Sequence, residues 1–272
     1  MNLQAHNHLD LTGKHAEIHR SCQCAAICIS SPFELRPFFR MFLKLMSTKS
    51  LAQLEKTITS CRLCPRLVEW REEVARVKAP RFSGDKYWGK PVHGFGDPQA
   101  QLLIFGLAPA AHGANRTGRM FTGDRSGEWL YRALYTSGFA NQPGSVSVDD
   151  KLKLRNCYIT ASVRCAPPGN KPLPEESRNC RPYLLAEYRL LTRVRVILGL
   201  GKIAFDTAFD TIKELNETSL TKRPKFAHGA EARLNDRTIL LGSYHPSQQN
   251  TFTGKLTVKM FDEIFRKVVS HL

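Results

Sequence analysis

Four short apolar runs, with helical patterns between them, constrain the fold of this chain more than any other feature. The runs are residues 102–107, 157–163, 194–200 and 238–243. Continuous apolar runs of this length are typical of strands buried on both faces. Apolar residues recur with helical spacing in 127–135, 175–191, 202–212 and 257–269. Strands that alternate with helices favour right-handed crossovers, so we predict an α/β fold, a three-layer α/β/α sandwich around a mainly parallel four-stranded sheet.

A short motif follows each predicted strand directly. The motifs are Gly106-Leu-Ala-Pro-Ala110, Arg164-Cys165, Gly199-Leu-Gly-Lys202 and Tyr244-His-Pro-Ser247. The carboxyl ends of parallel strands meet at one edge of the sheet, where open α/β sheets bind ligands. We therefore expect the four motifs to converge on one site.

Residues 1–47 differ in composition from the rest of the chain. They hold four of the nine histidines and three of the eight cysteines, Cys22, Cys24 and Cys28. They lack a clean hydrophobic period and the order of a signal peptide. We expect a disordered extension or a gene-model artefact over 1–47, with Met41 or Met46 as the start, and one catalytic domain over 48–272. A functional module in 1–47 is the remaining alternative.

The charge of the chain favours a polyanionic partner. Its net charge is +16 at pH 7, and Lys and Arg displace the counterions that condense on nucleic-acid phosphates. Membrane surfaces also attract cations, and some proteins are merely basic, so charge alone does not decide between these partners. No run of about 18 apolar residues occurs, which excludes a membrane-spanning helix. We expect a monomer in the bacterial cytosol, associated with the nucleoid.

The cysteines suggest a metal site. Cys61 and Cys64 form a C-x2-C pair between helical patterns, and Cys165 and Cys180 flank a proline-rich loop. Four thiolates can hold a [4Fe–4S] cluster, whereas structural zinc sites usually use two close pairs. A cluster, a zinc ion and ordinary buried cysteines all stay open on spacing alone. Cys157 lies within a predicted strand, where core packing is the simpler interpretation.

Long motifs resemble those of type 5 (family 5) uracil-DNA glycosylases. The resemblance rests on four segments, 106–124 (GLAPAAHGANRTGRMFTGD), 244–254 (YHPSQQNTFTG), 163–172 (VRCAPPGNKP) and 61–67 (CRLCPRL). It covers residues 51–272. It implies a uracil-DNA-glycosylase-like fold, a [4Fe–4S] cluster on Cys61, Cys64, Cys165 and Cys180, and a monofunctional enzyme of base-excision repair. Such an enzyme flips uracil, and other deaminated bases such as hypoxanthine, out of single- or double-stranded DNA and releases them by hydrolysis.

Base release requires a pocket and a donor to the departing base. We predict that His245 is this donor, because a neutral imidazole can hydrogen-bond the base oxygen that gains charge. Phe121 is the predicted stacking platform. Backbone groups of Gly106, Ala108 and Pro109, together with Ser247, complete the predicted contacts with the substrate. A structural turn at His245 and core packing of Phe121 are the alternatives.

The group that positions the attacking water is harder to assign. Leu107 and Ala108 follow the first strand, and neither side chain can polarise water. Asn115 is the predicted catalytic partner of His245, because its amide can orient a water or contact a base edge. Asp124 suits a helix N-cap equally well. His112 and Ser162 are further candidates.

The basic residues near these motifs are predicted to hold DNA phosphates. They are Arg116, Arg119, Arg164 and Lys202, with Arg125 and Lys171 nearby. Tyr244 or residues 248–250 are candidates to enter the duplex beside the flipped base.

Two other functional classes compete with the glycosylase. One is a non-catalytic DNA-binding module that holds a metal cluster. The other is a nucleotide-binding redox protein, which is disfavoured because the turn after the first strand lacks the G-x-G-x-x-G pattern.

Overall fold

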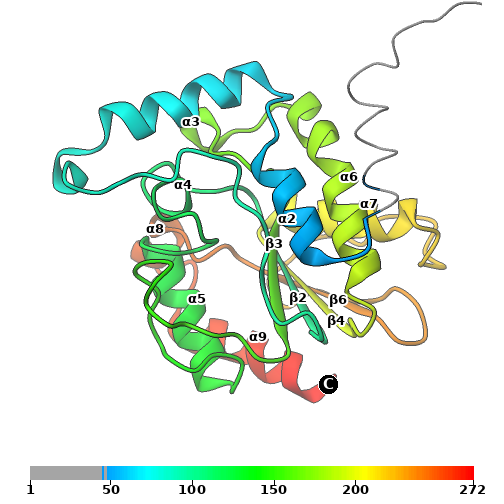
Figure 1. Cartoon of the computed structure of the whole chain (residues 1–272). Coiled ribbons are helices and arrows are strands. Elements are labelled where there is room, and N and C mark those ends of the chain that lie inside the picture. Colours follow the sequence, from blue (N-terminus) through cyan, green and yellow to red (C-terminus); the bar gives the residue numbers. More distant parts are fainter. Residues whose placement is uncertain (1–44, 46–47) are drawn as a thin grey trace, which may run out of the picture. The chain divides into compact units, whose positions relative to one another are not determined.

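The computed structural model describes residue 45 and residues 48–272 (Figure 1). The chain divides into two units, 1–35 and 36–272, and all the described residues belong to the second. The predictions made for residues 1–44, 46 and 47 therefore lie outside the described residues. Within the described part, no helix is long and apolar enough to cross a membrane.

A single sheet of six strands forms the centre of the described unit. Its strands are β1 Phe95–Gly96, β2 Leu102–Gly106, β3 Cys157–Ala161, β4 Val196–Leu200, β5 Glu231–Arg233 and β6 Ile239–Ser243, in the order β1-β3-β2-β4-β6-β5. The central four strands are parallel, and β1 and β5 pair antiparallel at the two edges. The four predicted strands and their parallel arrangement are confirmed. The two short edge strands were not predicted.

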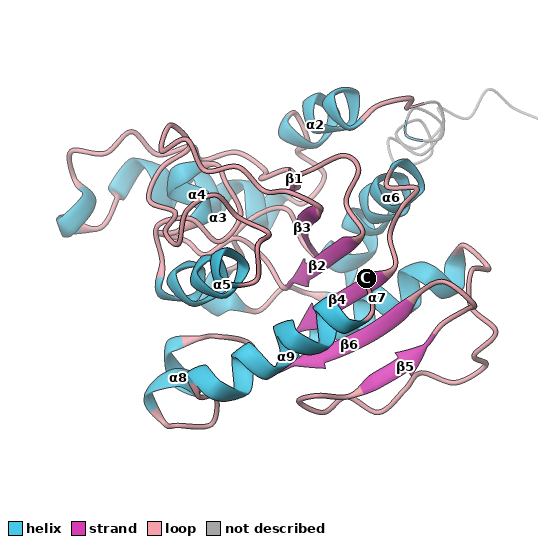
Figure 2. Cartoon of the chain, turned by 90° about the horizontal axis from the view of Figure 1, so that it is seen from below, coloured by secondary structure: helices cyan, strands magenta, loops and turns pink. Residues whose placement is uncertain are grey.

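Helices cover both faces of this sheet, as predicted (Figure 2). The helices of the described part are α2 Leu51–Thr59, α3 Pro65–Val77, α4 Ala114–Thr117, α5 Arg125–Thr136, α6 Pro174–Leu190, α7 Lys202–Glu214, α8 Gln248–Phe252 and α9 Val258–Ser270. Single turns of 3-10 helix occur at Pro80–Phe82 and Pro168–Asn170. The short helices α4 and α8, which were not predicted, both lie in the motif segments that follow strands.

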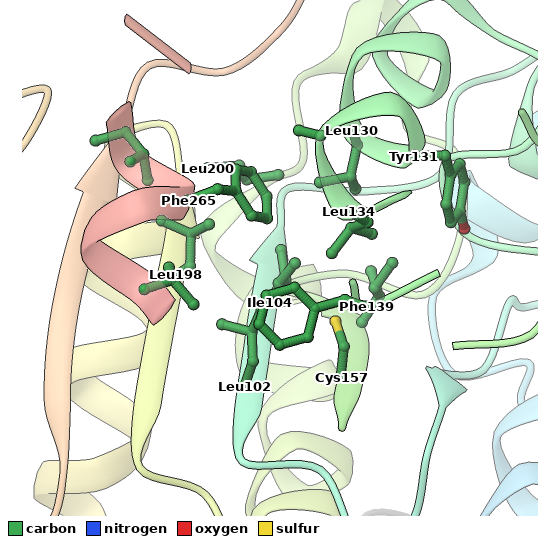
Figure 3. Close-up of a cluster of buried hydrophobic side chains, with 14 of the residues drawn as sticks. Leu102, Ile104, Leu130, Tyr131, Leu134, Phe139, Cys157, Leu198, Leu200 and Phe265 are labelled. Carbon is green, nitrogen blue, oxygen red and sulfur yellow. The ribbon is translucent and has the colours of Figure 1, made fainter. Parts of the chain in front are cut away.

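Alternate residues of the strands pack against different helices. Leu102, Ile104 and Leu198 point to one face, where they contact α5 and α9 (Figure 3). Leu103 and Ile197 point to the other face, against α6 and α7. This alternation is the period of two expected of a strand, and burial on both faces explains why the predicted strands are continuously apolar.

Leu45 precedes residue 48, the predicted start of the catalytic domain, yet it is part of the folded unit. It is buried and packs in one cluster with Leu54 and Ile58 of α2 and Tyr183 of α6. The folded domain therefore extends at least to residue 45.

Candidate active site

A pocket of about 580 Å³ lies at the carboxyl ends of β2 and β6. Residues of four segments and Ala114 of α4 line it, and the segments are 107–110 after β2, 120–126 up to the start of α5, 169–170 in the proline-rich loop, and 245–249 after β6. Of the four motifs predicted to converge, those after β2 and β6 therefore meet in this pocket, whereas the motifs after β3 and β4, Arg164-Cys165 and Gly199-Leu-Gly-Lys202, are not part of its lining. A larger hollow of about 850 Å³ lies elsewhere and contains none of the predicted site residues.

Phe121 and His245 face each other in this pocket. Their rings are stacked, with centroids 6.0 Å apart and planes inclined by 30°. Phe121 has a φ of +55°, a conformation that non-glycine residues adopt at a cost and that often marks functional sites. Two glycines make room for it. A Cβ on Gly106 would lie 2.9 Å from Phe121 Cζ, and one on Gly127 would lie 1.8 Å from the Phe121 carbonyl oxygen.

This arrangement changes the role of Gly106. Gly106 is not among the residues that line the pocket; instead it lies behind the Phe121 ring. Ala108, Pro109 and Ser247 line the pocket, as predicted from the motifs. Ser247 has a second role, because its Oγ accepts a hydrogen bond from the Asn250 amide (3.4 Å) and caps α8.

The segment after β6 holds His245 in place. The Asn250 side-chain amide donates to the His245 carbonyl oxygen at 2.8 Å, so the cap of α8 and the loop carrying His245 form one unit. Burial lowers the pKa of His245 to about 4, because the charged imidazolium loses its hydration. The imidazole is therefore neutral near pH 7, the form that the prediction requires of the donor.

We expect this low pKa to appear as a pH dependence of stability. From pH 6.5 to about 4, the unfolded chain binds a proton at this imidazole that the native chain does not, so the free energy of unfolding decreases as the pH falls. His245→Gln removes this contribution. The free energy of unfolding of the wild type, relative to that of the variant and measured by urea denaturation, should therefore decrease progressively as the pH falls through this window. A difference that is independent of pH would contradict the prediction.

Asp124 combines two of its candidate roles. Its Oδ1 accepts from the Gly127 amide at 2.8 Å, which caps α5, so the N-cap interpretation is confirmed. The residue also lines the pocket. Burial raises the pKa of its carboxyl group, against the hydrogen bonds from the first turn of α5.

Asn170 lines the pocket, and the sequence analysis missed it. It follows Gly169 in a turn where both residues have positive φ, +57° and +59° respectively. The Pro-Pro-Gly-Asn segment was a recognisable turn signal. Nothing local, however, indicated that this loop reaches the end of β2.

The other candidates for positioning water lie outside the pocket lining. Asn115 is fully buried, and its Nδ2 donates to the Arg71 carbonyl oxygen at 3.2 Å. The His112 Nδ1 is 3.0 Å from the Tyr87 hydroxyl. Ser162 is buried and donates to the Gly106 carbonyl oxygen at 3.2 Å. The catalytic role of Asn115 stays a prediction, and its burial adds no support to it.

The structure contradicts the phosphate contacts predicted for three arginines, because their guanidinium groups bind the protein itself. Arg119 is buried and pairs with Asp150 at 2.6 Å. Arg164 is buried against Glu187. Arg116 donates to Asp85 at 2.7 Å and to two carbonyl oxygens, and it covers the Phe82 ring.

Two other basic side chains near the pocket are exposed. Lys202, the fourth predicted phosphate ligand, lies on the surface beside Asp206. Arg125 lines the pocket and pairs with Glu128 at 3.0 Å. Exposed ion pairs contribute little to stability, so both cations can exchange their partner for a phosphate.

The four cysteines predicted as ligands line one small cavity. Cys61, Cys64, Cys165 and Cys180 meet there with the side chains of Arg71 and Arg164. Burial raises the pKa of Cys165 to about 11, although Arg71 opposes this shift. Within the described part of the chain, no three ligand side chains converge as a site for a single metal ion. Cys157 is buried in the sheet core, as predicted.

One residue, Ala108, connects the cysteine cavity with the pocket. Ala108, which lines the pocket, also packs against the cluster formed by Leu67, Val163, Cys165 and Cys180. The loop between Cys165 and Cys180 carries Gly169 and Asn170 into the pocket. These two pocket residues therefore lie between Cys165 and α6, the helix that carries Cys180.

Comparison with known proteins gives consistent matches. The family model of the uracil DNA glycosylase superfamily matches residues 93–269, which include every residue that lines the pocket. A type-5 uracil-DNA glycosylase from Mycobacterium bovis is 53% identical over 219 residues, 80% of this chain and 80% of that protein. One from Thermus thermophilus is 52% identical over 210 residues, 77% of this chain and 92% of that protein. A type-4 uracil-DNA glycosylase from Archaeoglobus fulgidus is 26% identical over 200 residues, 73% of this chain and 82% of that protein.

Proposed function

This chain belongs to the uracil DNA glycosylase superfamily, and from that premise we propose that it removes uracil from DNA by hydrolysis of the N-glycosidic bond. The observation that carries the proposal is the pocket in which the Phe121 ring faces a neutral His245. It lies where an open α/β sheet binds its ligand. A base inside a duplex has to flip out of the stack to reach it, which costs a few kcal/mol.

We assign the two rings different parts of the reaction. Phe121 provides an apolar face for the flipped base, and its ring lies directly against Gly106. His245 donates a hydrogen bond to the base oxygen on which negative charge develops as the bond breaks. A preorganised donor of this kind in a partly buried site stabilises the transition state more than the ground state.

Two polar side chains of the pocket are better placed than Asn115 to position the attacking water. Asp124 and Asn170 both line the pocket, whereas Asn115 does not. The Asp124 carboxylate is held in place beside the pocket, because its Oδ1 accepts the α5 cap bond from the Gly127 amide and its Oδ2 lies against Gly113. We propose that the two residues share this task, and that departure of the base is driven mainly by stabilisation of its charge rather than by a strong base.

Hypoxanthine is the second substrate that we propose. The part of the lining that follows β2, residues 107–110, offers a base only apolar side chains and backbone groups, whereas the polar side chains of the lining come from 124–126, 170 and 245–249. A site that makes few base-specific hydrogen bonds discriminates weakly. Incubation with oligonucleotides that carry uracil or hypoxanthine, followed by detection of abasic sites, tests both parts. The absence of abasic sites would favour the competing class, a DNA-binding module without activity.

We propose that the four cysteines hold a [4Fe–4S] cluster. Their shared cavity supports this assignment, as do buried N–H groups of Arg71 and Arg164 that have no hydrogen-bond partner. Such groups are costly unless an acceptor is present, and an anionic iron–sulfur cluster provides sulfur acceptors. When bound, the cluster would tie the start of α3 to the loop after β3 and to α6.

We therefore expect the purified protein to contain iron and acid-labile sulfide. Cys165→Ser should lower the iron content and the thermal stability, because it removes one ligand at the loop that reaches the pocket. Iron and zinc analysis, with Cys157→Ser as a matched control, measures this effect. Zinc without iron in the wild type would contradict the assignment.

DNA is the partner of the proposed reaction, and the exposed side chains of Arg125, which lines the pocket, and Lys202, at the start of α7, are available to its phosphates. The monomeric state and the location in the bacterial cytosol remain predictions.

A further inference from the structure

Two of the four cysteine sulfurs accept a hydrogen bond from a side chain. Arg71 Nη1 donates to Cys165 Sγ at 2.9 Å, and Asn179 Nδ2 donates to Cys64 Sγ at 3.4 Å. The Asn179 amide is neutral, so Arg71 is the one of these two donors that brings a charge directly to a sulfur.

The two arginines of the cavity differ in how far a nearby carboxylate neutralises their charge. Arg164 is paired with the equally buried Glu187, so this pair adds no net charge to the cavity. Arg71 is 2% exposed, and its nearest carboxylate is Glu72 at 3.7 Å. That carboxylate is 45% exposed and is already bonded to Arg62 at 2.5 Å. The charge of Arg71 is therefore compensated only weakly from the protein side.

The geometry points to Arg71 as the residue through which this chain sets the ease of one-electron reduction of the cluster. This inference rests on the proposed [4Fe–4S] site. Reduction by an external one-electron donor adds one negative charge to the cluster, with no bond broken and no proton required. A buried cation that is hydrogen-bonded to a ligand sulfur stabilises the more negative state, because charges interact strongly in a poorly hydrated site. Net charge and hydrogen bonds to the sulfurs are known determinants of cluster potentials.

The site is also accessible to a small reductant. Arg71 and Cys61 line a second hollow of about 740 Å³, together with Trp88. The residue whose charge we invoke is therefore located between the cysteine cavity and an open surface depression.

The experiment compares the reduction potential of the purified holoprotein with that of three variants. Arg71→Met removes the charge, and Arg71→Lys keeps the charge but loses the planar donor group. Arg76→Met is the matched control, because Arg76 lies on the same helix, is 73% exposed and pairs with Glu73. Iron and sulfide content are measured first, and the potential is then measured by dithionite titration with mediator dyes.

We expect Arg71→Met to disfavour the reduced state by a factor of about ten or more, which is 59 mV toward more negative potential for one electron. Arg71→Lys should shift the potential less, and Arg76→Met should leave it nearly unchanged. If Arg71→Met loses its iron while Arg71→Lys retains it, the requirement for a charge at this position is equally supported.

Two results would overturn the inference. One is an Arg71→Met variant that retains iron with the potential of the wild type. The other is equal loss of iron from the Met and Lys variants, which would mean that Arg71 acts through its shape alone. A wild-type protein without iron would instead remove the cluster proposal itself, and uracil release measured on the same sample separates that outcome from failure of the enzymatic proposal.

Discussion

His245→Ala is expected to lower the single-turnover rate of uracil release by about 10²–10³, the usual loss for one donor to a developing oxyanion. DNA affinity should change little, because the hydrogen bond strengthens only as charge builds on the departing base. The physical basis is the burial that keeps the imidazole neutral and the contact between its loop and the α8 cap. Rates at saturating enzyme and affinities on an uncleaved analogue separate the two effects.

A matched control for this variant is His93→Ala. His93 is a partly exposed histidine beside Glu55 and lies outside the pocket, so its substitution should leave the rate nearly unchanged. A His245→Ala variant that binds DNA weakly but keeps its single-turnover rate would show that His245 positions the substrate. The donor would then have to be a backbone amide of the 107–110 segment.

Arg119→Met is expected to lower the free energy of unfolding by about 3–5 kcal/mol, because it leaves a buried carboxylate without its cation. The Arg119 guanidinium also donates to Ser145 Oγ at 2.7 Å and to Thr122 Oγ1 at 3.0 Å. Its loss therefore disrupts a buried network that ties the Phe121 segment to the loop at Asp150. Urea denaturation measures the change.

The salt dependence of DNA binding tests the same residue independently. A phosphate ligand contributes about one charge to the slope of log affinity against log salt concentration, and the buried Arg119 should contribute none. Arg125→Met is the comparison with the opposite expectation, because this exposed arginine is assigned to a phosphate and should lower the slope, while its surface pair is worth about 1 kcal/mol or less. A stable Arg119→Met variant with a reduced salt slope would restore the original phosphate interpretation.

The parallel sheet was predictable because its strands are buried on both faces and are therefore apolar throughout. The edge strands carry no such signal. β1 has two residues, and β5 is the polar segment Glu231–Arg233 with no buried residue. Each exists because a neighbouring strand offers it a free edge, at Ile159 and Leu241 respectively, and local sequence cannot show such pairing.

The site was predictable to the extent that topology determines it. Parallel strands bring the motifs after β2 and β6 together, which places Phe121 and His245 in one pocket. The arginines were misread because their partners are distant in sequence. Asp85 and Asp150 each lie 31 residues from the arginine they bind, and Glu187 lies 23 residues away. A basic residue near a motif has the same local appearance whether it binds a phosphate or a carboxylate.

Asn170 was missed as a pocket residue for a different reason. Its turn was visible in the sequence, but its approach to the pocket depends on the folding of the loop between Cys165 and Cys180. The same loop connects the proposed cluster to the pocket, so the two sites are coupled through the backbone rather than through any motif.

The most direct test of the central claim is a crystal structure of the protein with duplex DNA that contains 2′-fluoro-2′-deoxyuridine, in which the fluorine slows bond cleavage. We predict that the uracil lies outside the base stack, against the Phe121 ring, with a carbonyl oxygen in hydrogen-bond contact with the His245 imidazole. A uracil that stays stacked in the bound duplex, or that occupies a different hollow, would contradict the account.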